Sequence, residues 1–351
     1  MTTRLIASAV AMLLSVGSPL AVVAQTPDAP ARQPIAGRVL TLDEAVAIAL
    51  EQQPQITARL FDYAAARYRV DQALAPLLPQ LTGSVTTTKS KNNSIPSSAI
   101  TTAPATITFR EFNQTLNANV ALSQLLFDFG KNLAATEATR KLQDVALEDV
   151  ELQRQLISLS VKEAYTNILF AQRLIRVNEQ ALQRADLNLK SARGFYEVGT
   201  RPKSDVARAE VDVANAKLTV IQARNAERLA LVALNTAMAI DVDTPTTIQD
   251  NLVYEPVTID RLAIRAEALR QRPEYRQAKL NADVAEARQR QAFRNFFPDI
   301  TGSGTYGGVR PELGEVWAVT LSLSWTLYDG GGRIGRYREA RAIYDATVAR
   351  I

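Results

Sequence analysis

Carboxylates and lysines are the side chains through which this chain could perform catalysis, because its sequence contains neither histidine nor cysteine. Their absence excludes Ser-His-Asp and Cys-His triads, histidine-ligated metals and thiolate zinc sites. The clustered carboxylates that remain are Asp43 and Glu44, and Glu148, Asp149 and Glu151. Two facing carboxylates could cleave a glycosidic bond by acid-base catalysis, as in an envelope hydrolase.

The charges around these carboxylates favour a different interpretation. Basic and acidic residues alternate along the same segments, which is typical of solvated helix faces. We therefore predict no catalytic residue, no metal site and no cofactor, so that the chain is not an enzyme. The net charge of +4 is small for 351 residues and is not clustered, which argues against binding to nucleic acid.

The N-terminus predicts export from the cytoplasm. Arg4 precedes an apolar run at residues 5–16, and Ala24 is a small residue suited to cleavage, so residues 1–24 are interpreted as a signal peptide. A membrane anchor is the alternative, but it needs roughly 20 uninterrupted apolar residues. A glycine and a proline interrupt this run first. The stretch that follows, residues 25–40, is predicted to be a flexible leader.

Helical periodicity dominates the middle of the chain. Residues 131–195 contain no proline and a single glycine near their end, which predicts one very long helix or two nearly continuous ones. Heptad patterns run through residues 168–196 and 206–237, the second with alanine at every seventh position. Gly199 between them suits a helix C-cap. Residues 168–237 are therefore predicted to form an antiparallel coiled-coil hairpin whose small residues let the axes approach.

An internal duplication organises the rest of the chain. LLPQLTGS at residues 77–84 returns as FFPDITGS at 296–303. LLFDFG at 125–130 is answered by TLYDGG at 326–331. One supersecondary unit has been used twice, which excludes most ordinary enzyme folds.

Apolar and polar residues alternate in several segments, and this alternation predicts strands with one apolar face. The expected lipid-facing positions of the last strand are Trp317, Val319, Leu321, Leu323, Trp325 and Leu327. A strand of roughly 12 residues suits a tilted membrane crossing. The two tryptophans, roughly 26 Å apart along an extended strand, suit two interfacial girdles. The matching strand of the first copy is weaker, because Gln124 stands where Trp325 does.

Each apolar strand follows another strand that begins at the duplicated proline, so each copy contributes one β-hairpin. The first hairpin contains a polar, aperiodic run at residues 89–106, which is predicted to be an exposed loop. If the apolar face meets lipid, the sheet must close, and two hairpins supply too few strands. The smallest membrane barrels have about eight strands, so an oligomer is required. A soluble domain whose helices cover the face is the alternative.

Together these motifs resemble the TolC-like outer-membrane efflux channel family. The resemblance covers residues 40–351 and also includes TLDEAVAIALEQQP at 41–54 and FYEVGTRPKSDVARAE at 195–210. It implies an α+β fold with long antiparallel coiled-coil helices and two β-hairpins per chain. It further implies a homotrimer whose twelve-stranded β-barrel continues as an α-helical barrel. The barrel would lie in the outer membrane of a Gram-negative bacterium, with helices extending into the periplasm.

The resemblance also implies partners and sites. The chain would be a passive conduit of an efflux or type I secretion system, docking a periplasmic adaptor (membrane fusion) protein and an inner-membrane pump. The adaptor-docking tip maps to Val198, Gly199 and Thr200. Ser204 and Asp205 match a hydroxyl-acid pair that holds the closed state, and helix N-terminal capping is their alternative role.

The duplication predicts the segments of the chain and their limits. By symmetry about 110 further residues, with a second hairpin and tip, would follow the last helix. A soluble periplasmic coiled-coil adaptor or structural spacer protein is the competing function. The expected segments are 1–24, signal peptide; 25–40, flexible leader; 41–78, helical segment of repeat 1; 79–127, outer-membrane β-hairpin 1; 128–258, long helices with a tip near residue 199; 259–297, helical segment of repeat 2; 298–328, outer-membrane β-hairpin 2; and 329–351, the start of truncated final helices.

Overall fold

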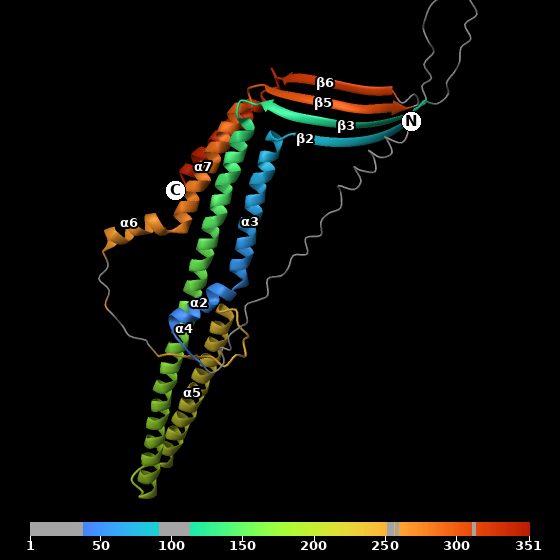
Figure 1. The fold of residues 1–351 in the computed structure, drawn as a ribbon. Helices are drawn as coiled ribbons and strands as arrows, with labels where there is room; N and C mark the ends of the chain where they lie inside the picture. Colours follow the sequence, from blue (N-terminus) through green and yellow to red (C-terminus); the bar gives the residue numbers. More distant parts are fainter. Residues whose placement is uncertain (1–37, 91–112, 251–255, 257–259, 311–313) are drawn as a thin grey trace, which may run out of the picture.

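The structure, a computed structural model, describes residues 38–90, 113–250, 256, 260–310 and 314–351. It confirms the α+β class: a curved sheet lies at one end, and helices run away from it (Figure 1). The hairpin of α4 and α5 reaches farthest from the sheet. The predicted signal peptide, nearly all of the predicted leader and residues 91–106 of the predicted loop lie outside the described residues. The prediction of a loop is wrong for Lys89 and Ser90, because both pair with a neighbouring strand.

The order of elements repeats once along the chain, as the duplication predicts. The first copy contains α2 (Leu42–Gln52), α3 (Pro54–Leu74), the 3₁₀ helix η1 (Ala75–Leu77), β2 (Gln80–Ser90), β3 (Asn113–Phe127), α4 (Lys131–Glu197) and α5 (Lys203–Ala237). The second contains α6 (Arg261–Gln271), α7 (Pro273–Arg294), β5 (Asp299–Arg310), β6 (Gly314–Ser324) and α8 (Gly332–Val348). Two short strands, β1 (Val39–Leu40) and β4 (Thr247–Ile248), pair with each other in parallel.

Four of the described strands form one antiparallel sheet in the order β2-β3-β5-β6. The two hairpins join through β3 and β5, where Gly304 pairs with Leu122, and on its other side Gly304 pairs with Val319 of β6. Directly paired residues share a face, so the register sets which side chains gather on each side of the sheet. β2 and β6 are the two edge strands.

The last strand ends earlier in the sequence than predicted. β6 ends at Ser324, so Trp325 and Leu327 lie beyond the strand to which the alternating pattern assigns them. Ser324 pairs with Asp299, the first residue of β5. The residue before Asp299 is Pro298, which has no backbone N–H to donate, so the ladder stops there.

The long helices confirm the coiled-coil hairpin. α4 is one helix of 67 residues, on the order of 100 Å long. It packs against α5 over its distal half and lies beside α3 and α7 near the sheet (Figure 1). On α5, Ala209, Val213, Val220 and Ala223 are buried, and all four occupy the predicted heptad positions. Alternating valine and alanine therefore forms the seam between the helices.

The main hydrophobic core lies where α2, α4 and α5 meet. Its largest buried side chain is Tyr165, whose hydroxyl lies 3.2 Å from the carbonyl oxygen of Leu40 and 2.8 Å from that of Gln249. These carbonyls belong to Leu40 at the end of β1 and to Gln249 just after β4. The predicted leader boundary is therefore wrong at its last two residues, because Val39 and Leu40 form β1 and Leu40 enters the core.

A buried asparagine turns the chain back toward this core after α5. The Asn235 side-chain amide donates to the carbonyl oxygens of Val242 and Thr244, at 3.1 and 3.0 Å. Its own carbonyl oxygen accepts from the Thr246 hydroxyl at 2.7 Å. With these three bonds the amide is well satisfied despite its burial, and it positions the segment that leads into β4.

Replacement of Gly307 by alanine is expected to destabilise the sheet. An added Cβ would lie 2.3 Å from the carbonyl oxygen of Ala118 and 2.8 Å from Asn119 Cα, both of which are backbone atoms of β3. Because neither atom can rotate away, the strands must separate, at a cost of about 1–3 kcal/mol. The measurement is the temperature at which the folded band disappears in a semi-native gel. Gly304→Ala is the control, since its nearest atom would be 4.0 Å away; equal loss of stability in both variants would contradict the argument.

Candidate functional site

The sheet presents one continuous apolar face that no described element covers. On β6, Trp317, Val319, Leu321 and Leu323 are 69, 82, 72 and 63% exposed. Exposed apolar area is unfavourable in water by roughly 25 cal/mol per Å², so a row of such residues marks a surface meant for lipid or a partner. Trp325 and Leu327, past the end of the strand, are also exposed.

The opposite face of the sheet is polar. Ser84 of β2 pairs with Asn119 of β3, and their side chains form a hydrogen bond. Ser303 of β5 lies between Ser123 of β3 and Thr320 of β6. An apolar face backed by a polar one is the pattern of transmembrane β-barrel strands.

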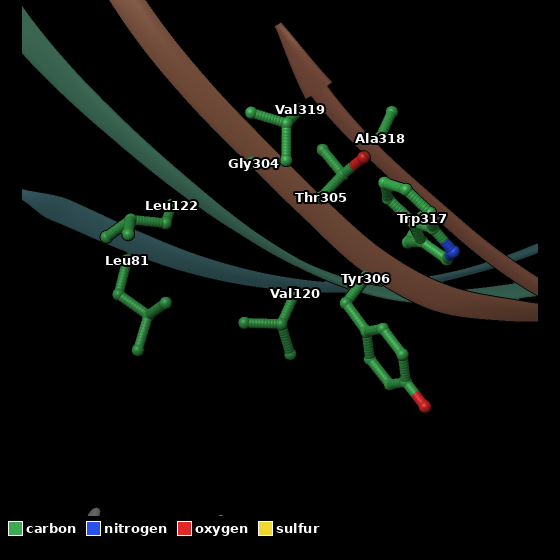
Figure 2. A pocket seen from close by; sticks show the side chains of 9 residues that line it. All are labelled: Leu81, Val120, Leu122, Gly304, Thr305, Tyr306, Trp317, Ala318 and Val319. Carbon is green, nitrogen blue, oxygen red and sulfur yellow. The ribbon is translucent and has the colours of Figure 1, made fainter.

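A shallow groove of about 430 Å³ runs over the apolar face. Its floor is Gly304, which lacks a side chain, and its walls include Leu122 and Val319 (Figure 2). Tyr306 and Trp317, a cross-strand pair, lie side by side at one end of it. The groove is a consequence of glycine in the middle of the apolar face, and it offers no cluster of polar groups for catalysis.

Two duplicated positions close the junction between sheet and helices in the same way. The indole N–H of Trp325 donates to the carbonyl oxygen of Phe296 at 3.0 Å, and the side-chain amide of Gln124 donates to that of Leu77 at 2.8 Å. Phe296 and Leu77 are corresponding residues of the duplicated motif. Gln124 is therefore a structural counterpart of Trp325, which hydropathy alone misses because the shared property is an N–H donor.

Duplicated aspartates begin the helices that leave the sheet. The carboxylate of Asp128 accepts the backbone amides of Gly130 and Asn132, at 2.9 and 2.7 Å. Asp329 accepts the amide of Arg333 at 2.9 Å. A carboxylate at a helix N-terminus accepts hydrogen bonds from the free backbone amides of the first turn. Its negative charge also interacts favourably with the positive end of the helix dipole. The sequence shows this motif as a repeat, but only the contacts reveal that it caps α4 and α8.

The predicted tip residues lie together in the turn between α4 and α5. The amide of Gly199 donates to the carbonyl oxygen of Tyr196, and that of Thr200 donates to Phe195, each at 2.9 Å. This is the Schellman arrangement, in which the residue after the cap adopts a left-handed conformation, and Gly199 has φ of 74°. Val198 is 71% exposed at the end of the hairpin. The tip is a defined turn with an exposed apolar side chain.

Ser204 and Asp205 lie in the first turn of α5. The N-cap residue is Pro202, and neither Ser204 nor Asp205 caps the helix with its side chain, so the predicted capping bond is not formed. The Asp205 carboxylate instead lies 3.9 Å from Arg201. An acidic side chain here still interacts favourably with the helix dipole.

The carboxylate clusters have structural environments. Glu44 and Thr41 form a capping box at the start of α2, in which the amide of Thr41 donates to Glu44 at 3.0 Å. That backbone hydrogen bond holds the pKa of the Glu44 carboxyl below its ordinary value. Asp43 is exposed beside it.

The second carboxylate cluster is paired with arginines. Glu148 lies 3.4 Å from Arg276 of α7, and Asp149 lies 3.3 Å from Arg59 of α3. Glu151 pairs with Arg154 one turn along α4, at 2.8 Å. Arginines therefore pair with all three carboxylates, two from neighbouring helices and one from α4 itself, which fits a solvated helix face and not an acid-base pair. Across the described ranges, no three acidic side chains gather as a metal site requires.

The helical hairpin also carries an apolar stripe on its outer side, which the sequence analysis missed. On α5, Val211, Leu218 and Val232 fall on one seven-residue repeat and are 58, 52 and 43% exposed. Phe170 and Val177, seven residues apart on α4, are exposed as well. Such a repeat is the signal of a second helix-packing seam. None of the helices within the described residues combines the length and apolarity needed to cross a bilayer.

The sequence is similar to those of known proteins. The profile of the family described as Outer membrane efflux protein matches residues 45–239 and 264–351. The toluene efflux pump outer membrane protein TtgC of Pseudomonas putida is 24% identical over 271 residues, which cover 75% of this chain and 53% of TtgC. The chain spans about half the length of the curated relatives it matches.

Solved structures agree on the fold. A membrane protein from Pseudomonas aeruginosa superposes with a TM-score of 0.73 at 21% identity, covering 88% of this chain and 72% of that protein. The outer membrane protein VceC from Vibrio cholerae gives a TM-score of 0.69 at 21% identity, covering 88% of this chain and 74% of VceC. The similarity at this identity concerns the fold, whereas the family profile spans most of the sequence. The chain belongs to the outer membrane efflux protein family.

Proposed function

We propose that the chain is the outer-membrane channel component of a tripartite efflux or type I secretion system, and that it acts as a passive conduit. The observation that carries this proposal is a sheet with an exposed apolar face and a polar opposite face, joined to helices far longer than a compact domain uses. Such a sheet suits a β-barrel in the outer membrane, continued by a helical tube in the periplasm. Family membership supports the same interpretation.

Closure of the barrel requires further copies of the chain. In hydrocarbon, the unpaired backbone groups along the outer edges of β2 and β6 would each cost several kcal/mol. The strands of one chain are fewer than the roughly eight of the smallest membrane barrels, whereas three copies would give about twelve. We therefore propose a homotrimer in which β6 of one copy pairs with β2 of the next. The outer apolar stripes of α4 and α5 would meet neighbouring helices.

The hairpin tip is the proposed contact with the rest of the assembly. Val198, Gly199 and Thr200 would dock a periplasmic adaptor protein that links the channel to an inner-membrane pump, which supplies the energy. A rigid Schellman turn with an exposed valine can present a small apolar knob to a partner helix. Ser204 and Asp205, just beyond the tip, are the proposed gate-linking residues.

The channel function is tested by cell fractionation and by conductance. We expect the protein in the outer-membrane fraction and, once purified, stepwise ion currents across a planar lipid bilayer. Heat-unfolded protein is the control for currents from detergent alone. Recovery in the soluble periplasmic fraction would overturn the channel and support the adaptor or spacer function.

Val198→Asp is expected to abolish adaptor docking without changing the amount of protein in the outer membrane. A charge at the centre of a small apolar contact must be desolvated on binding, which costs several kcal/mol. Co-purification of the adaptor from cross-linked cells measures the effect. Val242→Asp is the matched control, because Val242 is 48% exposed and follows α5 at the opposite end of the hairpin. If Val198→Asp retains the adaptor, the tip is not the docking site.

Ser204→Ala combined with Asp205→Ala is expected to loosen the periplasmic entrance and raise the single-channel conductance. The change removes a hydroxyl and a carboxylate from the first turn of α5 but no hydrogen bond within the chain that the fold depends on. Thr219→Ala with Asp212→Ala, at exposed positions farther along α5, is the matched control. Unchanged conductance of the trimer would remove the gating role from both residues.

A further inference from the structure

The polar face of the sheet carries almost no charge. Neutral hydroxyl and amide side chains follow one another across its paired strands, as Ser84 and Asn119 do. Among the residues that the structure describes in these four strands, the pairing register assigns one charged residue, Asp299, to this face. Asp299 begins β5 and pairs with Ser324, which lies on the same side of β6 as Thr320. The register assigns the other charged residues of the strands to the apolar face.

Lys131, the first residue of α4, compensates the charge of Asp299. Its ammonium pairs with Oδ2 of the Asp299 carboxylate. The Lys131 and Asp299 side chains are 21 and 32% exposed, so the ion pair is only partly withdrawn from solvent. The second carboxylate oxygen, Oδ1, is buried and has no hydrogen-bond partner in the part of the chain that the structure describes. Asp299 therefore depends on Lys131 for its neutralisation.

Two arginines near the same junction are engaged elsewhere. The Arg333 side chain of α8 lies 3.4 Å from the carboxylate of Asp329. The Arg294 guanidinium of α7 donates to the carbonyl oxygen of Gly130 at 2.7 Å. Because neither arginine forms an ion pair with Asp299, the balance of charge at the start of β5 comes from Lys131.

The other copy of the repeat has no charge at the corresponding positions. The duplicated prolines align Asp299 with Gln80, and the duplicated aspartates align Lys131 with Gly332. Gln80 pairs with Ser123, so it lies on the polar face of β2 as Asp299 does on that of β5. Each copy therefore begins this face with either a neutral residue or a neutralised acid.

In the proposed channel, on which this inference rests, the apolar face meets lipid and the polar face lines the water-filled interior of the barrel. Rings of charged side chains give a pore its ionic selectivity. We propose that the Lys131–Asp299 pair determines specificity, because it cancels the one charge that would otherwise form such a ring at this face of the strands. The barrel section then admits polar organic solutes of either charge, as well as neutral ones.

The loss of one partner would expose the charge of the other in every copy of the chain. Fixed charges on the wall of a water-filled pore concentrate ions of the opposite sign. A potential of about one kT would change the local ratio of cations to anions roughly sevenfold. At 0.01 M salt the Debye length is about 30 Å, so the potential extends well into the pore.

Ion selectivity of the purified channel in a planar lipid bilayer tests the proposal. The reversal potential across a gradient of dilute KCl gives the ratio of K⁺ to Cl⁻ permeability. We expect Lys131→Met, which leaves Asp299 uncompensated, to raise this ratio several-fold. Asp299→Asn, which leaves Lys131 uncompensated, is expected to lower it several-fold. The matched control combines both changes and should restore the ratio of the unmodified channel. A merely structural role of the pair would alter stability, but it would not shift the ratio in opposite directions.

A further variant decides the proposal even if the single variants do not assemble. Asn119→Asp adds a negative charge to the polar face and keeps the oxygen that accepts the Ser84 hydroxyl. We expect it to raise the permeability ratio several-fold. An unchanged ratio in Asn119→Asp would overturn the inference, as would equal ratios in the unmodified channel and both single variants. Absence of current from the unmodified protein would instead overturn the proposed channel function.

Discussion

Pairing of the backbone along the edges of the sheet is the constraint on which the rest of the structure depends. The exposed apolar row on β6 suits the hydrocarbon interior of a membrane. Because hydrocarbon cannot form hydrogen bonds, every backbone N–H and C=O of a strand there must pair with another strand. The four described strands satisfy this internally except along the outer edges of β2 and β6. The proposed trimer answers this constraint, because pairing of β6 with β2 of the next copy would satisfy both edges.

The junction between sheet and helices connects the strands to the long helices by contacts that recur in the two copies of the repeat. Each copy of the repeat caps its outgoing helix with an aspartate, Asp128 or Asp329, and closes its strand with a side-chain N–H, Gln124 or Trp325. These contacts recur because the unit recurs. The ion pair between the two copies does not recur, because the counterpart of Lys131 is Gly332 and that of Asp299 is Gln80. The contacts within each repeat are thus regular, whereas the ion pair that joins the two repeats occurs once in the described residues.

Much of the fold could be predicted from local patterns. The heptad positions of α5, such as Val213 and Ala223, are the buried ones, because helical periodicity directly reports which side faces a partner. The alternating row on β6 is likewise exposed as one face. Prediction failed where a boundary depends on a distant partner. Trp325 fits the alternation, yet the strand ends before it because Pro298 lies at the limit of the neighbouring strand.

The sequence by itself therefore determined the elements, the duplication, the apolar face and the position of the tip, since each is written in the spacing of neighbouring residues. Only the tertiary structure decided that Leu40 joins the core beneath Tyr165, and that Asp205 faces Arg201 instead of capping its helix. It alone placed Phe129 against Phe297. The first and third of these contacts join residues more than a hundred positions apart, and the second selects one of two local partners for the same carboxylate. The periodicity of the sequence reports which face of an element is buried, but it does not specify such individual partners.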